Sequence, residues 1–566
     1  MPDQVKLYPR EKLDEVQRQF RELPGVSAIV YIQTCAAEKR RRRKRGSFPK
    51  ISERVYINTD VCEGCGDCGV QSNCVSLVPV ETELGRKRAV DQSSCNMDLS
   101  CVKGFCPSFV TLEGAELRKE KTKHIDIPDL VEPEIPSIDR TYNIVITGVG
   151  GTGVVTIGAL LAQASYLENK GVGVIEMAGL AQKGGAVTIH CRIANKKEDI
   201  SAIRVANNEA DCVIGGDLVV TAVSDILRVM KSDKTRVALN SFEIITGDFT
   251  RDTNFTIPSE SLVQRIVAKL GPSSVKIVDA NTLATALLGN SIYSNIILLG
   301  IAWQNGTIPL GKETILRAIE LNGVNVKENI QAFEIGRWAS TENDLLNKLG
   351  SNNSNTGESV EIDPIEFRRK HLTEFQGNSL ANEYIKIVNE FQNPLLKEAV
   401  AKSYHKLLAV KDEYEVARLH LKTADKVNRE FTGDFKIKFH LAPPLISKAV
   451  NGARPPKYQF GSWMIHVFRL LAAMKGVRGT VFDPFRFGEE RKLQGKLKQD
   501  YLDDLDKIRK LDSPDMDPEV LELAEIPQQV GGYGPVWKSN YLSAMKRRGE
   551  LHASIESHLE DNNTNS

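Results

Sequence analysis

YNIVITGVGGTGVVTIGALLAQASYL, residues 142–167, combines three local patterns in a row. The β-branched run NIVIT is typical of a strand, the glycines predict a tight turn, and the apolar run after them has the length of a helix. The spacing of Gly148, Gly150, Gly151 and Gly153 fits the motif G-x-G-x-x-G. A strand, a glycine turn and a helix in this order predict the first unit of an α/β fold.

The glycine turn has two interpretations. Glycines let the backbone approach a phosphate group, and a helix N-terminus offers amide donors, so the turn could bind a nucleotide. Glu176 ends the next predicted strand, where a dinucleotide-binding fold places its ribose-binding acid. In the other interpretation the glycines only allow close packing of the strand against the helix. The sequence leaves both open.

The loop GLAQKGG (179–185) follows the strand that contains Glu176. Loops at the carboxyl edge of an open α/β sheet often carry function. Lys183, beside two glycines, could hold a phosphate or contact a partner; a solvated loop is the alternative. Together with the glycine turn, Lys183 forms the candidate cofactor-binding set.

The rest of the chain divides by pattern. EKLDEVQRQFREL (11–23) predicts a helix, and VSAIVYI (26–32) predicts a buried strand. Strand and helix patterns alternate from 171 to 303, which predicts a parallel α/β sheet. The predicted divisions are an N-terminal segment 1–50, a cysteine-rich domain 51–124, a proline-rich linker 125–140, an α/β domain 141–345, a polar linker 346–360 and a mostly helical domain 361–560.

Composition excludes several classes of protein. The net charge of +1 over 566 residues gives no general attraction to nucleic acid or membranes. The basic run 39–45 lacks the aromatic residues that would accompany it in a nucleic-acid-binding module. No run approaches the ~18 apolar residues of a membrane helix, and the first residues lack the apolar core of a secretory signal. We therefore expect a cytoplasmic protein without nucleic-acid or membrane partners.

Seven of the ten cysteines lie between Cys62 and Cys106. Cys62, Cys65 and Cys68 are spaced so that one loop can hold three corners of a 4Fe–4S cluster, whose fourth ligand is then distant. Cys106 precedes a proline, as such distant ligands do. The first predicted cluster therefore has the ligands Cys62, Cys65, Cys68 and Cys106.

The second predicted cluster has three cysteines, Cys74, Cys95 and Cys101. Asp98 stands midway between the last two, and its carboxylate could be the fourth ligand. The cluster is then either an Asp98-ligated 4Fe–4S cluster or a three-iron form open at that corner. Zinc sites are the alternative, but structural zinc usually shows paired CxxC or Cys/His knuckles, and the segment contains one CxxCxxC and no histidine.

Several segments resemble the indolepyruvate ferredoxin oxidoreductase family of 2-oxoacid oxidoreductases. QTCAAEKRRRRKRG (33–46) is similar to the end of that family's thiamine-diphosphate domain, and CEGCGDC (62–68) with GFCPSFV (104–110) is similar to its ferredoxin module. GVGGTGVVTIGALLAQA (148–164) and AGLAQKGGAV (178–187) resemble its gamma-type domain, and FDPFRFGEERKL (482–493) resembles its C-terminal extension.

The resemblance implies a multidomain chain of mixed α/β and α+β class. It would contain a ferredoxin-like two-cluster module, a Rossmann-like gamma-type catalytic domain and a mostly helical C-terminal domain. Family members decarboxylate an aryl 2-oxoacid on thiamine diphosphate, transfer the acyl group to coenzyme A and pass two electrons through their clusters to ferredoxin. The glycine turn could then serve packing or the phosphates of coenzyme A.

The chain departs from the family in one respect: Gly-Asp-Gly, the start of a thiamine-diphosphate motif, is absent from the sequence. We therefore expect it to be the C-terminal part of a longer enzyme or one subunit of a split, oligomeric one, inactive in decarboxylation without the thiamine-binding part. Two other functions remain open: an independent flavin- or NAD-linked iron–sulfur oxidoreductase, and a non-catalytic iron–sulfur scaffold.

Overall fold

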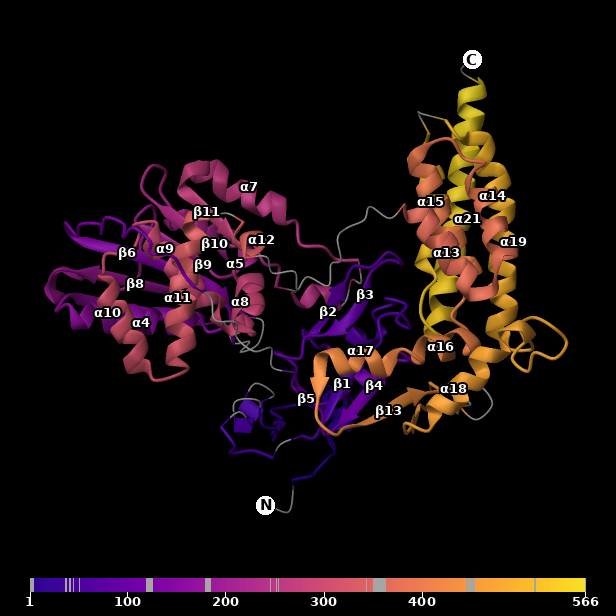
Figure 1. Ribbon diagram of the computed structural model, residues 1–566, viewed down its shortest axis with the longest axis horizontal. Helices are drawn as coiled ribbons and strands as arrows, with labels where there is room; N and C mark the ends of the chain where they lie inside the picture. Colours follow the sequence, from indigo (N-terminus) through magenta and orange to yellow (C-terminus); the bar gives the residue numbers. More distant parts are fainter. Residues whose placement is uncertain are drawn as a thin grey trace. The chain divides into compact units, whose positions relative to one another are not determined.

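The protein is described by a computed structural model (Figure 1). The structure describes residues 5–35, 38–39, 42–43, 45–49, 51–118, 126–178, 185–244, 246–250, 252, 254–342, 344–349, 363–443, 447, 454–513 and 516–564. The chain forms two compact units, Met1–Lys50 and Ile51–Ser566. Within the described residues, every helix is too short or too polar to cross a lipid bilayer.

The first unit contains η1 (Arg10–Lys12) and α1 (Leu13–Arg21), which confirms the predicted helix. The strand predicted over residues 26–32 is wrong, because this stretch forms no strand and most of its large apolar side chains are exposed. A strand needs a neighbour for its N–H and C=O groups, and the described part of this unit holds no second strand. Positions 40, 41 and 44 of the basic run lie outside the described residues.

In the second unit, a six-stranded sheet forms the centre of an α/β region. Its strands are β6 (Thr141–Val149), β7 (Gly171–Ala178), β8 (Ala186–Ala194), β9 (Cys212–Gly215), β10 (Arg236–Asn240) and β11 (Val275–Val278). Its helices are α4 (Val154–Leu167), α5 (Leu218–Thr221), α6 (Ser224–Val229), α7 (Ser259–Leu270), α8 (Ala280–Leu288), α9 (Ser294–Gln304), α10 (Lys312–Asn322), α11 (Val326–Thr341) and α12 (Leu345–Lys348). Alternate side chains of β6 belong to different cores, with Ile144 and Ile146 in one and Val145 in the other.

The strand order β11-β10-β9-β6-β8-β7 confirms a parallel sheet for four strands only. β8 runs antiparallel to both β6 and β7 and lies between them. A dinucleotide-binding fold would place the strand that contains Glu176 beside β6, and the structure does not. Glu176 pairs with Ile189 of β8, which in turn pairs with Ile146, so the acid lies two strands away from β6. That is about 10 Å at the usual strand spacing.

Two glycines bring α9 and α11 unusually close together. A Cβ on Gly300 would lie 2.1 Å from the carbonyl oxygen of Phe333, and one on Gly336 would lie 2.1 Å from that of Ile297. Because both neighbours are backbone atoms, only glycine fits at either position. This close contact is part of the apolar core around Trp303, whose side chain is fully buried.

The proline-rich stretch predicted as a linker is attached to this α/β region. The carbonyl of Leu130 accepts a hydrogen bond from Arg337 at 3.3 Å, and that of Val131 accepts one from Gln304 at 2.7 Å. Glu132 forms an ion pair with Lys312. The stretch is therefore attached to the α/β region by these hydrogen bonds and by this ion pair.

The cysteines lie in a small region of short elements. These are β1 (Glu53–Ile57), α3 (Asp67–Ser72), β2 (Leu77–Val80), β3 (Lys87–Val90), η2 (Ser100–Lys103), β4 (Phe109–Glu113) and β5 (Glu116–Leu117). β1 pairs antiparallel with β4, and β2 with β3. β1 and β4 thus close the region, and the seven cysteines lie between them, in loops, in α3 and in η2.

The C-terminal region is mainly helical, as predicted (Figure 1). Its helices are α13 (Pro364–Gln376), α14 (Asn378–Val388), α15 (Pro394–Leu408), α16 (Glu413–His420), α17 (Thr423–Glu430), α18 (Met464–Ala473), α19 (Glu489–Ile508), α20 (Pro518–Gln529) and α21 (Pro535–Thr564). The sequence did not predict its three strands, β12 (Phe431–Thr432), β13 (Lys436–Leu441) and β14 (Tyr458–Phe460). β13 pairs with β4, and β12 with β5, so this region completes the sheet of the cysteine region.

Candidate functional site

The four cysteines predicted for the first cluster line one pocket. Three of them, Cys62, Cys65 and Cys68, lie on the loop after β1 and on the first turn of α3. The loop turns sharply at Gly64 and Gly66, whose φ angles of 71° and 74° are left-handed and favour glycine. The fourth, Cys106, comes from the turn between η2 and β4, and it lines the same cavity.

Polar groups are directed at these sulfurs. The amide of Gly64 donates to Cys62 Sγ at 3.3 Å, and the hydroxyl of Ser108 lies 2.8 Å from Cys106 Sγ. Burial, together with the charges of Cys106 and Cys62, raises the pKa of the Cys65 thiol to about 12. Four thiolates would therefore repel one another in this cavity unless a cationic group bound them, which fits an iron–sulfur cluster.

The spacing of the sulfurs can be compared with that of thiolates on a single zinc ion. Thiolates bound to one zinc ion at about 2.3 Å would lie about 3.8 Å apart. All seven cysteines from 62 to 106 are among the described residues, where no three cysteine sulfurs lie within 4.8 Å of one another. Both cysteine sets therefore suit a group larger than one metal ion.

The second set, Cys74, Cys95 and Cys101, also gathers in one place. Burial, together with the charges of Cys74, Cys95 and Asp98, raises the pKa of the Cys101 thiol to about 12. The amide of Met97 donates to Cys95 Sγ at 3.3 Å, as Gly64 does in the first set. The structure thus brings together the residues that the sequence assigned to each cluster.

Asp98 lies at the exposed side of the second set. Its Oδ1 accepts hydrogen bonds from the Ser100 amide at 3.1 Å and the Ser100 hydroxyl at 2.8 Å. This pairing accounts for one carboxylate oxygen. Ligation of iron by Asp98 stays a prediction.

The glycine turn is built for close packing at its first position. A Cβ on Gly148 would lie 2.4 Å from Val154 Cγ2. The amide of Gly150 donates to the carbonyl of Gly185 at 2.8 Å, which ties the turn to the start of β8. Gly151 and Gly153 have left-handed φ angles of 90° and 96°. Their part in binding a phosphate stays a prediction.

A buried asparagine stabilises the same turn. Asn295, at the start of α9, donates from its side-chain amide to the carbonyl of Thr152. Lys183, the other predicted phosphate ligand, lies outside the described residues.

Sequence reasoning missed several residues that the C-terminal region places against the first set. Lys457 Nζ donates to the carbonyls of Val102 at 2.9 Å and Gly104 at 2.7 Å. Arg454 forms an ion pair with Asp67 at 2.8 Å. Lys457 and Arg454 could not be predicted, because single basic residues form no sequence pattern. The only signal for a contact of this kind was the glycine-rich GGYG at 531–534.

Comparisons with known proteins identify the α/β region. Indolepyruvate oxidoreductase subunit IorB of Pyrococcus horikoshii is 31% identical to this chain over 205 residues, which cover 36% of the chain and 98% of the relative. The chain belongs to the 2-oxoacid:ferredoxin oxidoreductase family. The family model for pyruvate ferredoxin/flavodoxin oxidoreductase matches residues 143–339 of this oxidoreductase.

Other relatives agree with this membership. The pyruvate/ketoisovalerate oxidoreductases common subunit gamma of Pyrococcus furiosus is 29% identical to this family member over 193 residues, covering 33% of the chain and 92% of the relative. The crystal structure of pyruvate oxidoreductase subunit PORC from Thermotoga maritima matches with 20% identity and a TM-score of 0.26, covering 35% of the chain and 97% of that structure. The sequence relatives alone support describing the α/β region of this oxidoreductase as a gamma-type region.

A second family model matches residues 362–550 and is described as a family of unknown function, DUF6537. Neither family model reaches the cysteines at 62–106. The role of the C-terminal region in this oxidoreductase must therefore come from its contacts.

Proposed function

We propose that this chain is the electron-relay and gamma-type portion of an indolepyruvate-type 2-oxoacid:ferredoxin oxidoreductase. The complete enzyme would oxidatively decarboxylate an aryl 2-oxoacid, transfer the acyl group to coenzyme A and deliver the electrons to ferredoxin. Family membership supports the reaction class, and the relative named indolepyruvate oxidoreductase supports the substrate. The observation that carries the relay is the arrangement of seven cysteines in two sets, each with its own buried sulfurs.

In this proposal, Cys62, Cys65, Cys68 and Cys106 hold the first cluster, and Cys74, Cys95 and Cys101 hold the second with Asp98. A bound iron–sulfur cluster supplies one-electron redox chemistry. The chain positions the sulfurs on short loops between β1 and β4 and directs amides at them. It also buries Cys62, Cys68 and Cys101, which keeps water away from these ligands.

The thiamine diphosphate site belongs, in this proposal, to another domain or subunit of the enzyme. The 566 residues contain no Gly-Asp-Gly, and the stretch 33–46 resembles the end of a thiamine-binding domain. Ferredoxin is the proposed acceptor, and the working enzyme is a complex with the thiamine-binding part. The isolated chain should therefore hold clusters and fail to decarboxylate a 2-oxoacid.

Coenzyme A is the proposed ligand of the glycine turn. Gly151 and Gly153 flank Thr152 just before the N-terminus of α4, and Lys183 comes three residues before β8 in the sequence. Amides and a lysine suit the phosphates of this cofactor. Whether or not the turn binds coenzyme A, Gly148 has a packing role, because a Cβ at this position would meet Val154.

Metal and sulfide counting tests the relay. The chain is purified without oxygen, reconstituted with iron and sulfide, and assayed by chemical analysis and electron paramagnetic resonance (EPR). Two clusters are expected. Cys68→Ala should abolish the first and keep the second, and Cys101→Ala should do the reverse. A chain that binds zinc tightly and takes up no acid-labile sulfide would contradict the proposal.

A further inference from the structure

The sheet of the cysteine region is completed by the C-terminal region. β13 lies beside β4, with Ile437 opposite Leu112 and Phe439 opposite Val110. Figure 1 shows β13 next to β4 and β1. Phe439, Val110 and Leu112 are fully buried in one shared apolar core. Without β13, β4 would be an exposed edge strand, and this core would face water.

The connection between α20 and α21 covers the loop of the first cysteine set. The Tyr533 hydroxyl donates to the carbonyl of Val61 at 2.6 Å. A Cβ on Gly534 would lie 2.5 Å from the ring of Phe105, which lines the cysteine cavity. A Cβ on Gly532 would lie 3.4 Å from Cys65 Cβ. The glycines therefore let the backbone of residues 531–534 lie directly over the cysteine loop.

Two lysines of the C-terminal region reach the same loops. Lys411 Nζ donates to the carbonyl of Cys62 at 2.9 Å and pairs with Glu63 at 2.8 Å. Lys457 reaches the backbone just before Cys106 from the other side and lies 4.8 Å from the centre of the Phe109 ring. Burial lowers the pKa of the Lys457 ammonium, and the charge of Cys106 opposes this shift. Both lysines therefore place positive charge beside the first set.

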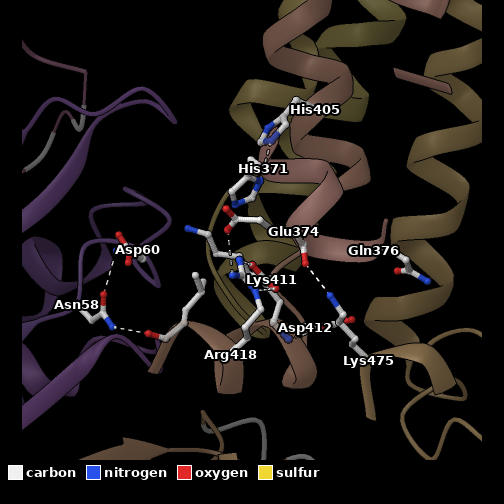
Figure 2. Close-up of polar contacts among 12 residues, drawn as sticks. Asn58, Asp60, His371, Glu374, Gln376, His405, Lys411, Asp412, Arg418 and Lys475 are labelled. Carbon is white, nitrogen blue, oxygen red and sulfur yellow. Dashed lines mark hydrogen bonds and ion pairs between the residues drawn. The ribbon is translucent and has the colours of Figure 1, made fainter. Parts of the chain in front are cut away.

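Further polar contacts surround Lys411 and join the cysteine region to the C-terminal region. Figure 2 shows Lys411 between the loop of Asn58 and the helices that carry His371 and His405, whose rings are hydrogen-bonded at 3.0 Å. Asn58 donates to the hydroxyl of Thr423 at 2.9 Å. A second contact joins His420 Nε2 to the carbonyl of Pro107 at 3.0 Å. The junction between the regions is thus a buried polar network, which fixes the geometry on both sides.

From these contacts we infer that residues 362–550, the part that matches a family of unknown function, are the second half of the iron–sulfur domain. They complete its sheet, cover the first cluster with residues 531–534 and place Lys411 and Lys457 beside it. The inference rests on the proposed function, since it needs a cluster on the first cysteine set. It assigns this region the task of shielding that cluster and tuning its reduction potential.

The charge effect has a definite sign. Reduction adds one negative charge to a cluster, and a nearby ammonium group stabilises the reduced form. Lys411 and Lys457 therefore raise the reduction potential of the first cluster. Lys457 also reaches Val102, next to Cys101 of the second set, whereas Lys411 contacts Cys62 and Glu63 beside the first set, so Lys411 is the charge to test.

The charge test is a redox titration of the full, reconstituted chain, followed by EPR. Lys411→Met should shift the midpoint potential of the first cluster to a more negative value and leave the second unchanged. Lys411→Arg keeps the charge and should restore most of the potential. Lys402→Met is the matched control, because Lys402 lies on α15 and pairs at the surface with Glu398. The signal that Cys68→Ala removes identifies the first cluster.

The shielding test measures the loss of iron to a ferrous chelator. Gly534→Ala pushes a methyl group against Phe105, so iron should leave the first cluster several-fold faster while the second keeps its rate. Gly549→Ala, on the following helix α21, is the control, because a Cβ there meets nothing within 4 Å. Unchanged potentials and unchanged release rates in these variants would overturn the inference. A wild-type chain that takes up no cluster would instead overturn the proposed function.

Discussion

At the scale of single residues, the proposal makes Asp98 the fourth ligand of the second cluster. Asp98→Ala should leave three ligands, and the second set should then hold three irons in place of four, a loss of about one iron per chain. Iron analysis and the EPR signal of a three-iron cluster measure this change. The cysteine ligands themselves remain, so the first cluster should be unaffected.

Asp91 provides a matched control for this substitution. It accepts hydrogen bonds from the Ser93 amide at 2.9 Å and the Ser93 hydroxyl at 2.6 Å, in the same way that Asp98 binds Ser100. Asp91→Ala thus removes an equivalent turn without removing a proposed ligand. Equal iron content in both variants and the wild type would exclude Asp98 as a ligand.

His190 on β8 makes the stability of the gamma-type region depend on pH. It is buried, its Nδ1 accepts the Val205 amide at 2.9 Å, and burial lowers its pKa to about 4. The unfolded value is about 6.5, so the unfolded chain binds the proton first. The stabilising contribution is therefore complete above pH about 6.5 and is lost as the pH falls toward about 4.

Thermal unfolding at pH 7 and pH 5 checks this dependence. His190→Asn keeps an acceptor for the Val205 amide and does not titrate. The midpoint temperature of unfolding should fall more between pH 7 and pH 5 in the wild type than in the variant. Equal losses would show that His190 does not titrate as the structure implies.

At the scale of elements, the crossing of α9 and α11 depends on glycine. Gly336→Ala places a methyl group 2.1 Å from the Ile297 carbonyl oxygen, so the helices must separate. We expect a loss of about 1–3 kcal/mol or more in the free energy of unfolding. Gly495→Ala in α19, where nothing lies within 4 Å, should stabilise by about 0.5–1 kcal/mol. Denaturant unfolding measures the free energy of unfolding of both variants. Equal values would contradict this interpretation of the helix contact.

At the scale of the whole molecule, the cysteine region depends on a segment some 300 residues later in the chain. Residues 51–118 alone lack β13 and the aromatic side chains that share their core. This fragment should be insoluble or bind little iron. The fragment 126–349 contains the complete six-stranded sheet and should fold by itself. Circular dichroism and iron content measure both, and a folded, cluster-loaded 51–118 fragment would contradict the prediction.

The amino-acid sequence by itself determined the local features of this protein. Glycine spacing predicted the turn after β6, helical periodicity predicted the C-terminal helices, and cysteine spacing predicted which of Cys62–Cys106 belong to each set. These features depend on neighbours close in the chain, so a local pattern records them. The same reasoning placed a strand at 26–32, where the β-branched residues have no partner strand to pair with.

Only the tertiary structure decided which strands pair and what covers the cysteines. β8 lies between β6 and β7 and pairs antiparallel with each, so the backbone groups of β7 bond to β8 and not to β6. Glu176 therefore lies away from the glycine turn. Lys411, Lys457 and Gly534 meet the cysteine loops from positions hundreds of residues away. Pairing and burial join residues that no local pattern connects, so the cover of the first cysteine set became visible only in the folded chain.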